Sequence, residues 1–367
     1  MLALKDYLGD FREEPGYLDF AGFGPLSSKA NEESLLYSEL LTHGRYGSLD
    51  HLKGNETRLK TALSQSLGFS AEQFVFQRSV ENAYFQVFFG LGTGLLIAAS
   101  ESPGAVYAAV RAQQAMGQLV AIWMASDYGR ITPSSVREQL TSGTGAVFVS
   151  QVDHRTGHVV DLEGIREVIG DRLLILDVTQ GLGAVSSPYQ LADVVVGSGS
   201  TWLRAGFGTA FLALSERAVE RLRPVLSGNS AAQPVEHFDQ IGAPESGAAA
   251  FQISSPDPIA QARLAAVLER MNAIGQSKIS AALQQGVDTL VDIVHAHKLT
   301  LLSPVQSVER SGIVTFAAEA GRELGMIAAL HNHGITATQQ QQSIRMSVHI
   351  SSTNETFDMV RHALSEA

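Results

Sequence analysis

The fold of this chain is indicated most clearly by residues 194–209, which read Val194-Val195-Val196-Gly197-Ser198-Gly199-Ser200-Thr201-Trp202-Leu203-Arg204-Ala205-Gly206-Phe207-Gly208-Thr209. Three consecutive valines are typical of a strand buried on both faces of a parallel sheet. The glycine and serine residues that follow indicate a turn. This turn places the side chain of Thr201 directly before Trp202.

Similar apolar runs occur on both sides of this segment and alternate with helical patterns. They predict strands at 74–76, 95–99, 119–124, 146–149, 173–176 and 209–214, and helices at 55–67, 81–89 and from a turn at 102–104 to Met116. This alternation favours an α/β fold with a mostly parallel sheet.

The pattern changes after residue 257, where an amphipathic helix at 258–274 leads into a second region. Helices are predicted there at 279–295, 322–333 and 356–364, and strands at 313–316 and 344–348. A chain of 367 residues is long for one core, and chains of this size divide into domains. We therefore predict a large domain at 18–257 and a small domain formed by 1–17 and 258–367.

The composition excludes several classes of function. The net charge of −11 argues against nucleic-acid partners, which need clustered basic residues. The absence of cysteine excludes disulfides, thiolate metal sites and a persulfide-carrying nucleophile. The first eight residues are too mixed in polarity for a secretory segment, and no run of eighteen apolar residues predicts a membrane span. We expect a cytoplasmic protein with neither a nucleic-acid nor a membrane partner.

A polar motif follows the predicted strand at 173–176 and reads Leu176-Asp177-Val178-Thr179-Gln180-Gly181-Leu182-Gly183. An unpaired carboxylate is costly to bury, so Asp177 should meet a cation or strong hydrogen-bond donors. The alternative is that Asp177 only caps the turn that follows it. His154 and His158 are four residues apart but lie in a strand-to-turn context rather than on a helix, so we predict no metal site.

Together with residues 150–157 and 343–349, these motifs resemble those of pyridoxal-phosphate (PLP) enzymes of fold type I, in the class V branch that includes aminotransferases, cysteine desulfurases and kynureninases. The resemblance extends in motif order from Tyr17 to His349. It implies a large domain with a mixed, mostly parallel sheet flanked by helices, a small α+β C-terminal domain, and a homodimer with its sites at the interface. The absence of cysteine removes the cysteine desulfurase mechanism, which needs a catalytic cysteine.

The resemblance also implies a role for each matched position. Asp177 would pair with the protonated pyridine nitrogen of the cofactor, and Gln180 and His154 would hydrogen-bond ring substituents. Arg345 would bind the carboxylate of an amino-acid substrate, although a structural ion pair is the alternative. The remaining matches are Ser79, Val80, Ser198 and Ser200 at phosphate positions, Ser102 at the ring-stacking position, and Ser255 at a position that reaches across the dimer interface.

Several matched positions depart from the family pattern. Thr201 stands where relatives carry the lysine that forms the Schiff base, and a hydroxyl group cannot form an imine. Val80 and Glu81 replace hydroxyl residues of the phosphate cup, and Ser102 and Ser200 replace larger rings. We therefore expect PLP or pyridoxamine phosphate to bind non-covalently, if either binds at all.

Three functions remain open at this point. The first is a non-classical family member that keeps a pocket for an amino acid or for its adduct with the cofactor. The second is a catalytically inactive paralogue that serves as a binding or dimer-partner subunit. The third is an engineered substitution at Thr201 in an ordinary transaminase or lyase, although several independent departures argue against a single engineered change.

Overall fold

The computed structural model describes residues 3–44, 46–237, 239–318 and 321–366. A seven-stranded sheet with the order β1-β7-β6-β5-β4-β2-β3 forms the centre of the larger part. Its strands are β1 (Phe74–Gln77), β2 (Gly94–Ala98), β3 (Val120–Met124), β4 (Thr144–Ser150), β5 (Leu173–Asp177), β6 (Val194–Ser198) and β7 (Ala210–Leu214). β7 runs antiparallel to β1 and β6, and the other neighbours are parallel. The predicted mixed, mostly parallel sheet is confirmed.

Helices cover both faces of this sheet. Alternate residues of β5 point into different cores, because Leu174 and Leu176 join one apolar cluster while Leu173 and Ile175 join another. This double burial explains why the strands read as continuous apolar runs. The first cluster contains residues of α3 (Ser48–Leu67), α6 (Pro133–Gln139), α7 (Leu162–Ile169) and α9 (Pro258–Ile274), and the second contains residues of α4 (Val80–Gly90), α5 (Pro103–Met116) and α8 (Glu216–Arg221).

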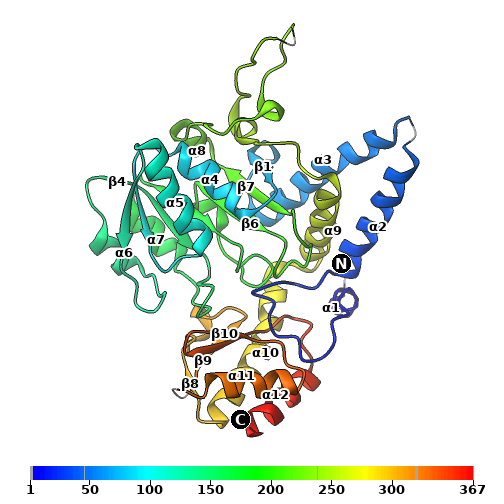
Figure 1. Cartoon of the computed structure of the whole chain (residues 1–367), viewed down its shortest axis with the longest axis vertical. Helices are drawn as coiled ribbons and strands as arrows, with labels where there is room; N and C mark the ends of the chain where they lie inside the picture. The colour runs from blue at the N-terminus through cyan, green and yellow to red at the C-terminus, as the bar shows by residue number, and fades with distance from the viewer. Residues whose placement is uncertain (1–2, 45, 238, 319–320, 367) are drawn as a thin grey trace.

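The C-terminal region forms the smaller body at the bottom of Figure 1. It holds a four-stranded antiparallel sheet with the order β10-β11-β9-β8. Its elements are α10 (Gln276–Ala296), β8 (Thr300–Leu301), β9 (Ile313–Ala317), α11 (Glu323–Asn332), β10 (Thr338–Gln340), β11 (Ser343–Ser347) and α12 (Asn354–Glu366). This is the small α+β domain that the family resemblance implied.

The domain boundaries at residues 17 and 257 remain predictions. The hydrophobic cores show which domain the residues near each boundary pack with. Leu264, Leu268 and Met271 of α9 belong to a core cluster of the large sheet, whereas Leu18 and Phe20 belong to the core of the small domain. α9 therefore packs against the large sheet, and the segment around residue 20 packs with the core of the small domain.

Two segments project from the large domain in Figure 1. One is the pair formed by α3 and α2 (Ser28–His43), which follows the short helix α1 (Leu4–Leu8). Ala30 is the buried residue of α2, and Leu35 and Leu36 are exposed. The other is the loop between α8 and α9. No helix in the described part of the chain is both long and apolar enough to cross a membrane.

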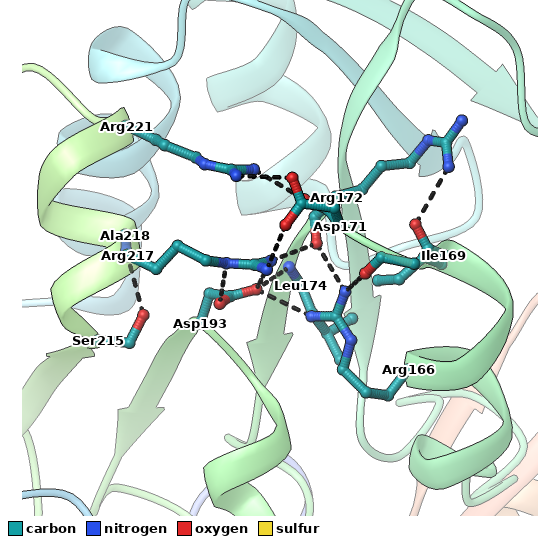
Figure 2. A network of polar contacts seen from close by, with 11 residues as sticks. Arg166, Ile169, Asp171, Arg172, Leu174, Asp193, Ser215, Arg217, Ala218 and Arg221 are labelled. Carbon is teal, nitrogen blue, oxygen red and sulfur yellow. Dashed lines mark hydrogen bonds and ion pairs between the residues drawn. The ribbon is translucent and has the colours of Figure 1, made fainter.

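A network of charged side chains holds the amino ends of β5 and β6, at the edge opposite the polar motifs (Figure 2). The buried carboxylate of Asp193 accepts hydrogen bonds from Arg166, Arg217 and the backbone N–H of Leu174. Arg166 comes from α7 and Arg217 from α8, so this carboxylate joins a helix on each face of the sheet to its edge.

Candidate functional site

A cavity of about 630 Å³ lies at the carboxyl ends of β5 and β6, beside the first turns of α4 and α5. Open α/β sheets bind their ligands at this edge. The predicted site residues that line it are Ser79, Val80, Ser102, His154, Asp177, Gln180, Ser198, Ser200 and Thr201. Segments separated by more than a hundred residues are thus brought to one place.

Asp177 lies buried at the end of β5 with both carboxylate oxygens engaged. Oδ1 accepts the backbone N–H of Thr179 at 2.7 Å, and Oδ2 accepts the hydroxyl of Tyr84 at 2.5 Å. Burial raises the pKa of Asp177, while the hydrogen bonds from Thr179 and Tyr84 oppose the rise. The turn-capping alternative and the expected strong donor are therefore both observed on the same side chain.

Tyr84 is a site residue that the sequence analysis missed. It lies on α4 one turn after Val80, faces the cavity, and also contacts the Ser102 hydroxyl at 3.2 Å. Burial and the negative charge of Asp177 keep the pKa of this phenol well above its usual value. The i to i+4 spacing from Val80 was the available signal, because residues four apart share a helix face.

Gln180 connects three segments around the cavity. Its amide nitrogen donates to the carbonyl of Ala21 at 2.9 Å, and its oxygen accepts the indole N–H of Trp202 at 3.0 Å. Trp202 is itself buried in the core of the small domain. Gln180 therefore holds the turn that carries Thr201 against the N-terminal segment.

Thr201 lies on the cavity wall with its hydroxyl already engaged. Its Oγ1 donates to the carbonyl of Thr179 at 2.8 Å, and the side chain is buried. Among the described residues lining this cavity, Arg78 is the only one with a permanently cationic side chain, and no lysine lines it. The position before Trp202 therefore presents a bound hydroxyl group to the cavity.

Hydroxyl groups and a helix start form the other end of the cavity. Ser79 caps α4 by accepting from the backbone N–H of Asn82, and the hydroxyls of Ser198 and Ser200 lie 3.0 Å apart. Arg78, a second residue that the sequence analysis missed, is exposed there and has no ion-pair partner among the described residues. Helix N-termini with hydroxyls and a guanidinium favour anions, whereas the nearby Glu81 carboxylate opposes them.

A second cavity of about 410 Å³ adjoins the first, and His154 lines both. Its other lining residues are Tyr128, Arg155, Thr156, Leu302, Thr315, Gln340, Gln341, Gln342 and Ser343. They come from the large and the small domain, and no carboxylate is among them. Burial lowers the pKa of His154, which favours a neutral imidazole between the two cavities.

Two predicted residues lie outside both cavities. The buried guanidinium of Arg345 pairs with Asp19 at 3.0 Å and donates to the carbonyl of His154 at 2.9 Å. This is the structural ion pair considered as an alternative, and its substrate role stays a prediction. Ser255 is exposed and does not line the cavity of its own chain.

Known proteins share both the sequence pattern and the architecture. The sequence model described as aminotransferase class-V matches residues 75–364. The chain belongs to the class V aminotransferase family. This confirms the family predicted from the motifs.

The individual relatives of this class V protein have low sequence identity to it. Kynureninase from Deinococcus radiodurans is 28% identical over 189 residues, a match covering 49% of this chain and 46% of that protein. The match thus spans about half the length of that relative. Two solved structures share the fold at 17% identity. One is apo cysteine desulfurase from Thermococcus onnurineus NA1, with a TM-score of 0.87 and a match that covers 100% of this chain and 98% of that one. The other is a lysine-to-alanine mutant of C-DES with glycine covalently linked to its PLP cofactor, with a TM-score of 0.88 and full coverage of both chains. The predicted fold-type I architecture is confirmed.

Proposed function

We propose that this class V protein binds an amino acid together with pyridoxamine phosphate, or as an adduct with PLP, and does not act as an ordinary Schiff-base enzyme. The observation that carries the proposal is that Asp177 and Thr201 line the same cavity. Asp177 lies at its base, and Thr201, rather than a lysine, lies on its wall. A hydroxyl that donates to a backbone carbonyl cannot hold an aldehyde cofactor covalently.

The donor set of the cavity fits such a ligand. The Asp177 carboxylate suits a protonated pyridine nitrogen, and Gln180 and His154 stand where they could orient ring substituents. At the other end, Ser79, Ser198, Ser200 and the first turn of α4 would hold a phosphate. Arg78 would offset the charge of Glu81 there. Ser102, at the start of α5, would lie beside the ring.

When bound, the cofactor would supply an electron-withdrawing ring. The protein would supply orientation and charge: Asp177 would keep the ring nitrogen protonated, and Tyr84 would keep that carboxylate in place through its 2.5 Å hydrogen bond. Thr201 is neutral and weakly basic, so it would not carry a proton to or from the amino acid as a lysine amine does.

The second cavity supports an amino-acid ligand with a carboxylate group. Arg155 is the charged residue among its lining, its side chain is 35% exposed, and its only ion pair among the described residues is with Asp153 at 3.2 Å. Arg345 is buried against Asp19. We infer that Arg155 meets the ligand carboxylate in this cavity, with the amides of Gln340 to Gln342 completing a polar wall.

A homodimer is part of the same proposal. The leucines of α2 at 35 and 36 are exposed, as is Phe207 beside the cavity. Exposed apolar groups of this kind mark protein contacts, and the family resemblance specifies a second copy of the chain as the partner. Ser255 would then contact the cavity of the partner chain.

Thermal unfolding of the purified protein tests the ligand. Pyridoxamine phosphate and reduced amino acid–PLP adducts should raise the melting temperature of the wild type, because a ligand that binds only the native state stabilises it. Asp177→Asn should reduce the shift. Arg155→Gln should reduce it for adducts that carry a carboxylate but not for their amide analogues, with Arg111→Gln on the surface of α5 as the matched control.

The outcomes separate the two parts of the proposal. Unchanged melting with every ligand contradicts the binding function, and a stable mixed dimer with a lysine-bearing relative would then identify a partner subunit. A shift that is identical for carboxylate and amide ligands contradicts the role of Arg155 alone. Any chromophore or phosphate in the protein as purified should be identified before these titrations.

A further inference from the structure

Three metal-ligating side chains meet on the small domain, away from both cavities. His333 directly follows α11, and His362 and Glu366 lie one turn apart on α12. His333 Nε2 lies 2.9 Å from Glu366 Oε2, and His362 Nε2 lies 3.4 Å from Glu366 Oε1. The three ligand atoms lie within 4.8 Å of one another. We propose that His333, His362 and Glu366 bind one divalent transition-metal ion, with zinc as the best fit.

The spacing of the donor atoms supports this site. Zinc binds imidazole nitrogen and carboxylate oxygen at about 2.0–2.2 Å, so donors around a tetrahedral ion lie roughly 3.3 Å apart. The two nitrogen-to-oxygen distances, 2.9 and 3.4 Å, fall on either side of that value. The imidazole rings meet edge to face with centroids 4.8 Å apart, and both Nε2 atoms lie beside the same carboxylate.

The backbone already holds the ligands in place. The N–H of His333 donates to the carbonyl of Ala329, which fixes the residue at the end of α11. Leu330 of α11 and Ala363 of α12 pack in the same buried core, so the two helices cannot separate without exposing apolar surface. Residues 362 and 366 share one face of α12 because they are four apart.

The donor atoms of the three side chains favour one class of metal ion. Two imidazoles and one carboxylate suit zinc, copper or nickel better than calcium or magnesium, which prefer oxygen ligands. The exposed side chains of His362 and Glu366 leave the remaining coordination positions to water. Bound metal would link the C-terminal end of α11 to α12 and so stabilise the small domain.

Calorimetric titration of the tag-free, chelator-treated protein with Zn²⁺ tests the site. One equivalent should bind, and Co²⁺ should give a visible absorption spectrum of low-coordinate cobalt. His333→Ala and Glu366→Gln should each weaken zinc binding by at least about tenfold, since loss of even an outer hydrogen-bond partner costs that much. Zinc should raise the melting temperature of the wild type but not of these variants.

His43→Ala is the matched control, because His43 and Glu39 form an exposed histidine–glutamate pair 2.9 Å apart on α2, and the described residues offer that pair no third ligand. The His43→Ala variant should bind zinc as the wild type does. The proposal is overturned if the wild type binds no zinc, or if binding is unchanged in the folded His333→Ala and Glu366→Gln variants. Neither result depends on ligands of the two cavities.

Discussion

The hydroxyl of Thr201 lies on the cavity wall and donates its proton to the carbonyl of Thr179. The surrounding side chains remain polar and face the same cavity. Asp177 keeps two donors, and Gln180 anchors the adjoining Trp202. At the residue scale, a hydroxyl group that is already hydrogen-bonded therefore shares one cavity with Asp177 and Gln180.

A lysine introduced at position 201 should bind the proposed cofactor covalently. In Thr201→Lys, added PLP should produce visible absorbance, because the new amine would reach the aldehyde that the cavity is proposed to hold. The lost threonine hydrogen bond should cost only about 1 kcal/mol of stability. Thr201→Ala, which lacks both groups, should stay colourless. A folded Thr201→Lys protein that remains colourless would mean that the phosphate and ring positions no longer hold PLP.

Glu101 provides a pH-dependent test at the same scale. It is buried next to the cavity, and its carboxylate accepts from the N–H and hydroxyl of Ser150. Burial raises its pKa from 4.5 to about 7, with smaller contributions from the charges of Asp177 and Asp153. The folded state therefore binds this proton more tightly than the unfolded state, so stability is lost as the pH rises toward 7.

Glu101→Gln should remove this pH dependence. At pH 8 the variant should be more stable than the wild type by up to about 3 kcal/mol, and the difference should shrink near pH 5. Urea unfolding at both pH values measures it, with the exposed Glu138→Gln as control. Parallel stability–pH curves for wild type and Glu101→Gln would contradict the raised pKa.

The strands β5 and β6, which end at the cavity, are fixed by polar contacts at the opposite edge of the sheet. Asp193 sits directly before β6 and joins α7 and α8 through Arg166 and Arg217 (Figure 2). The N–H of Leu174 on β5 donates to the same carboxylate at 2.7 Å. β5 and β6 carry Asp177 and Ser198 at their other ends, so this network helps to set the register of the strands that build the site.

Removing the carboxylate should take a shared acceptor from two guanidinium groups and one backbone N–H, and the guanidinium groups would keep only their other bonds, such as those to the carbonyl of Arg172. Asp193→Ala should therefore lower the free energy of unfolding by about 3 kcal/mol, as measured by urea denaturation. Asp358→Ala removes a carboxylate from an exposed pair with Arg361 and should cost less than about 1 kcal/mol. Equal losses in the two variants would show that the network adds no stability beyond an exposed ion pair.

Across the whole molecule, Arg204 joins the turn after Thr201 to the N-terminal segment and the small domain. This fully buried guanidinium donates to Glu13, to the carbonyl of Pro25 and to Ser351. It also lies over the ring of Phe11 at 4.5 Å. These contacts link the position of the small domain to the turn that forms part of the cavity wall.

The proposed homodimer is also a property of the whole molecule. Sedimentation of the wild type should give the mass of two chains. Leu36→Glu should shift it toward one chain, because a charge would enter an apolar contact. Leu324→Glu, at an exposed leucine of α11, is the control and should stay dimeric. A wild type that sediments as a single chain would contradict the dimer.

The sequence by itself determined the sheet and the family, because continuous apolar runs and the order of the motifs carry that information. The helix at 258–274 was predicted with the bounds that the structure has. By contrast, α2 was not predicted, since few of its residues pack and it shows little amphipathic pattern. Only the tertiary structure decided that Tyr84 bonds Asp177, that Arg345 is paired with Asp19, and that His333 meets Glu366. These contacts join residues from 33 to 326 positions apart, and no local periodicity encodes which distant side chains will meet.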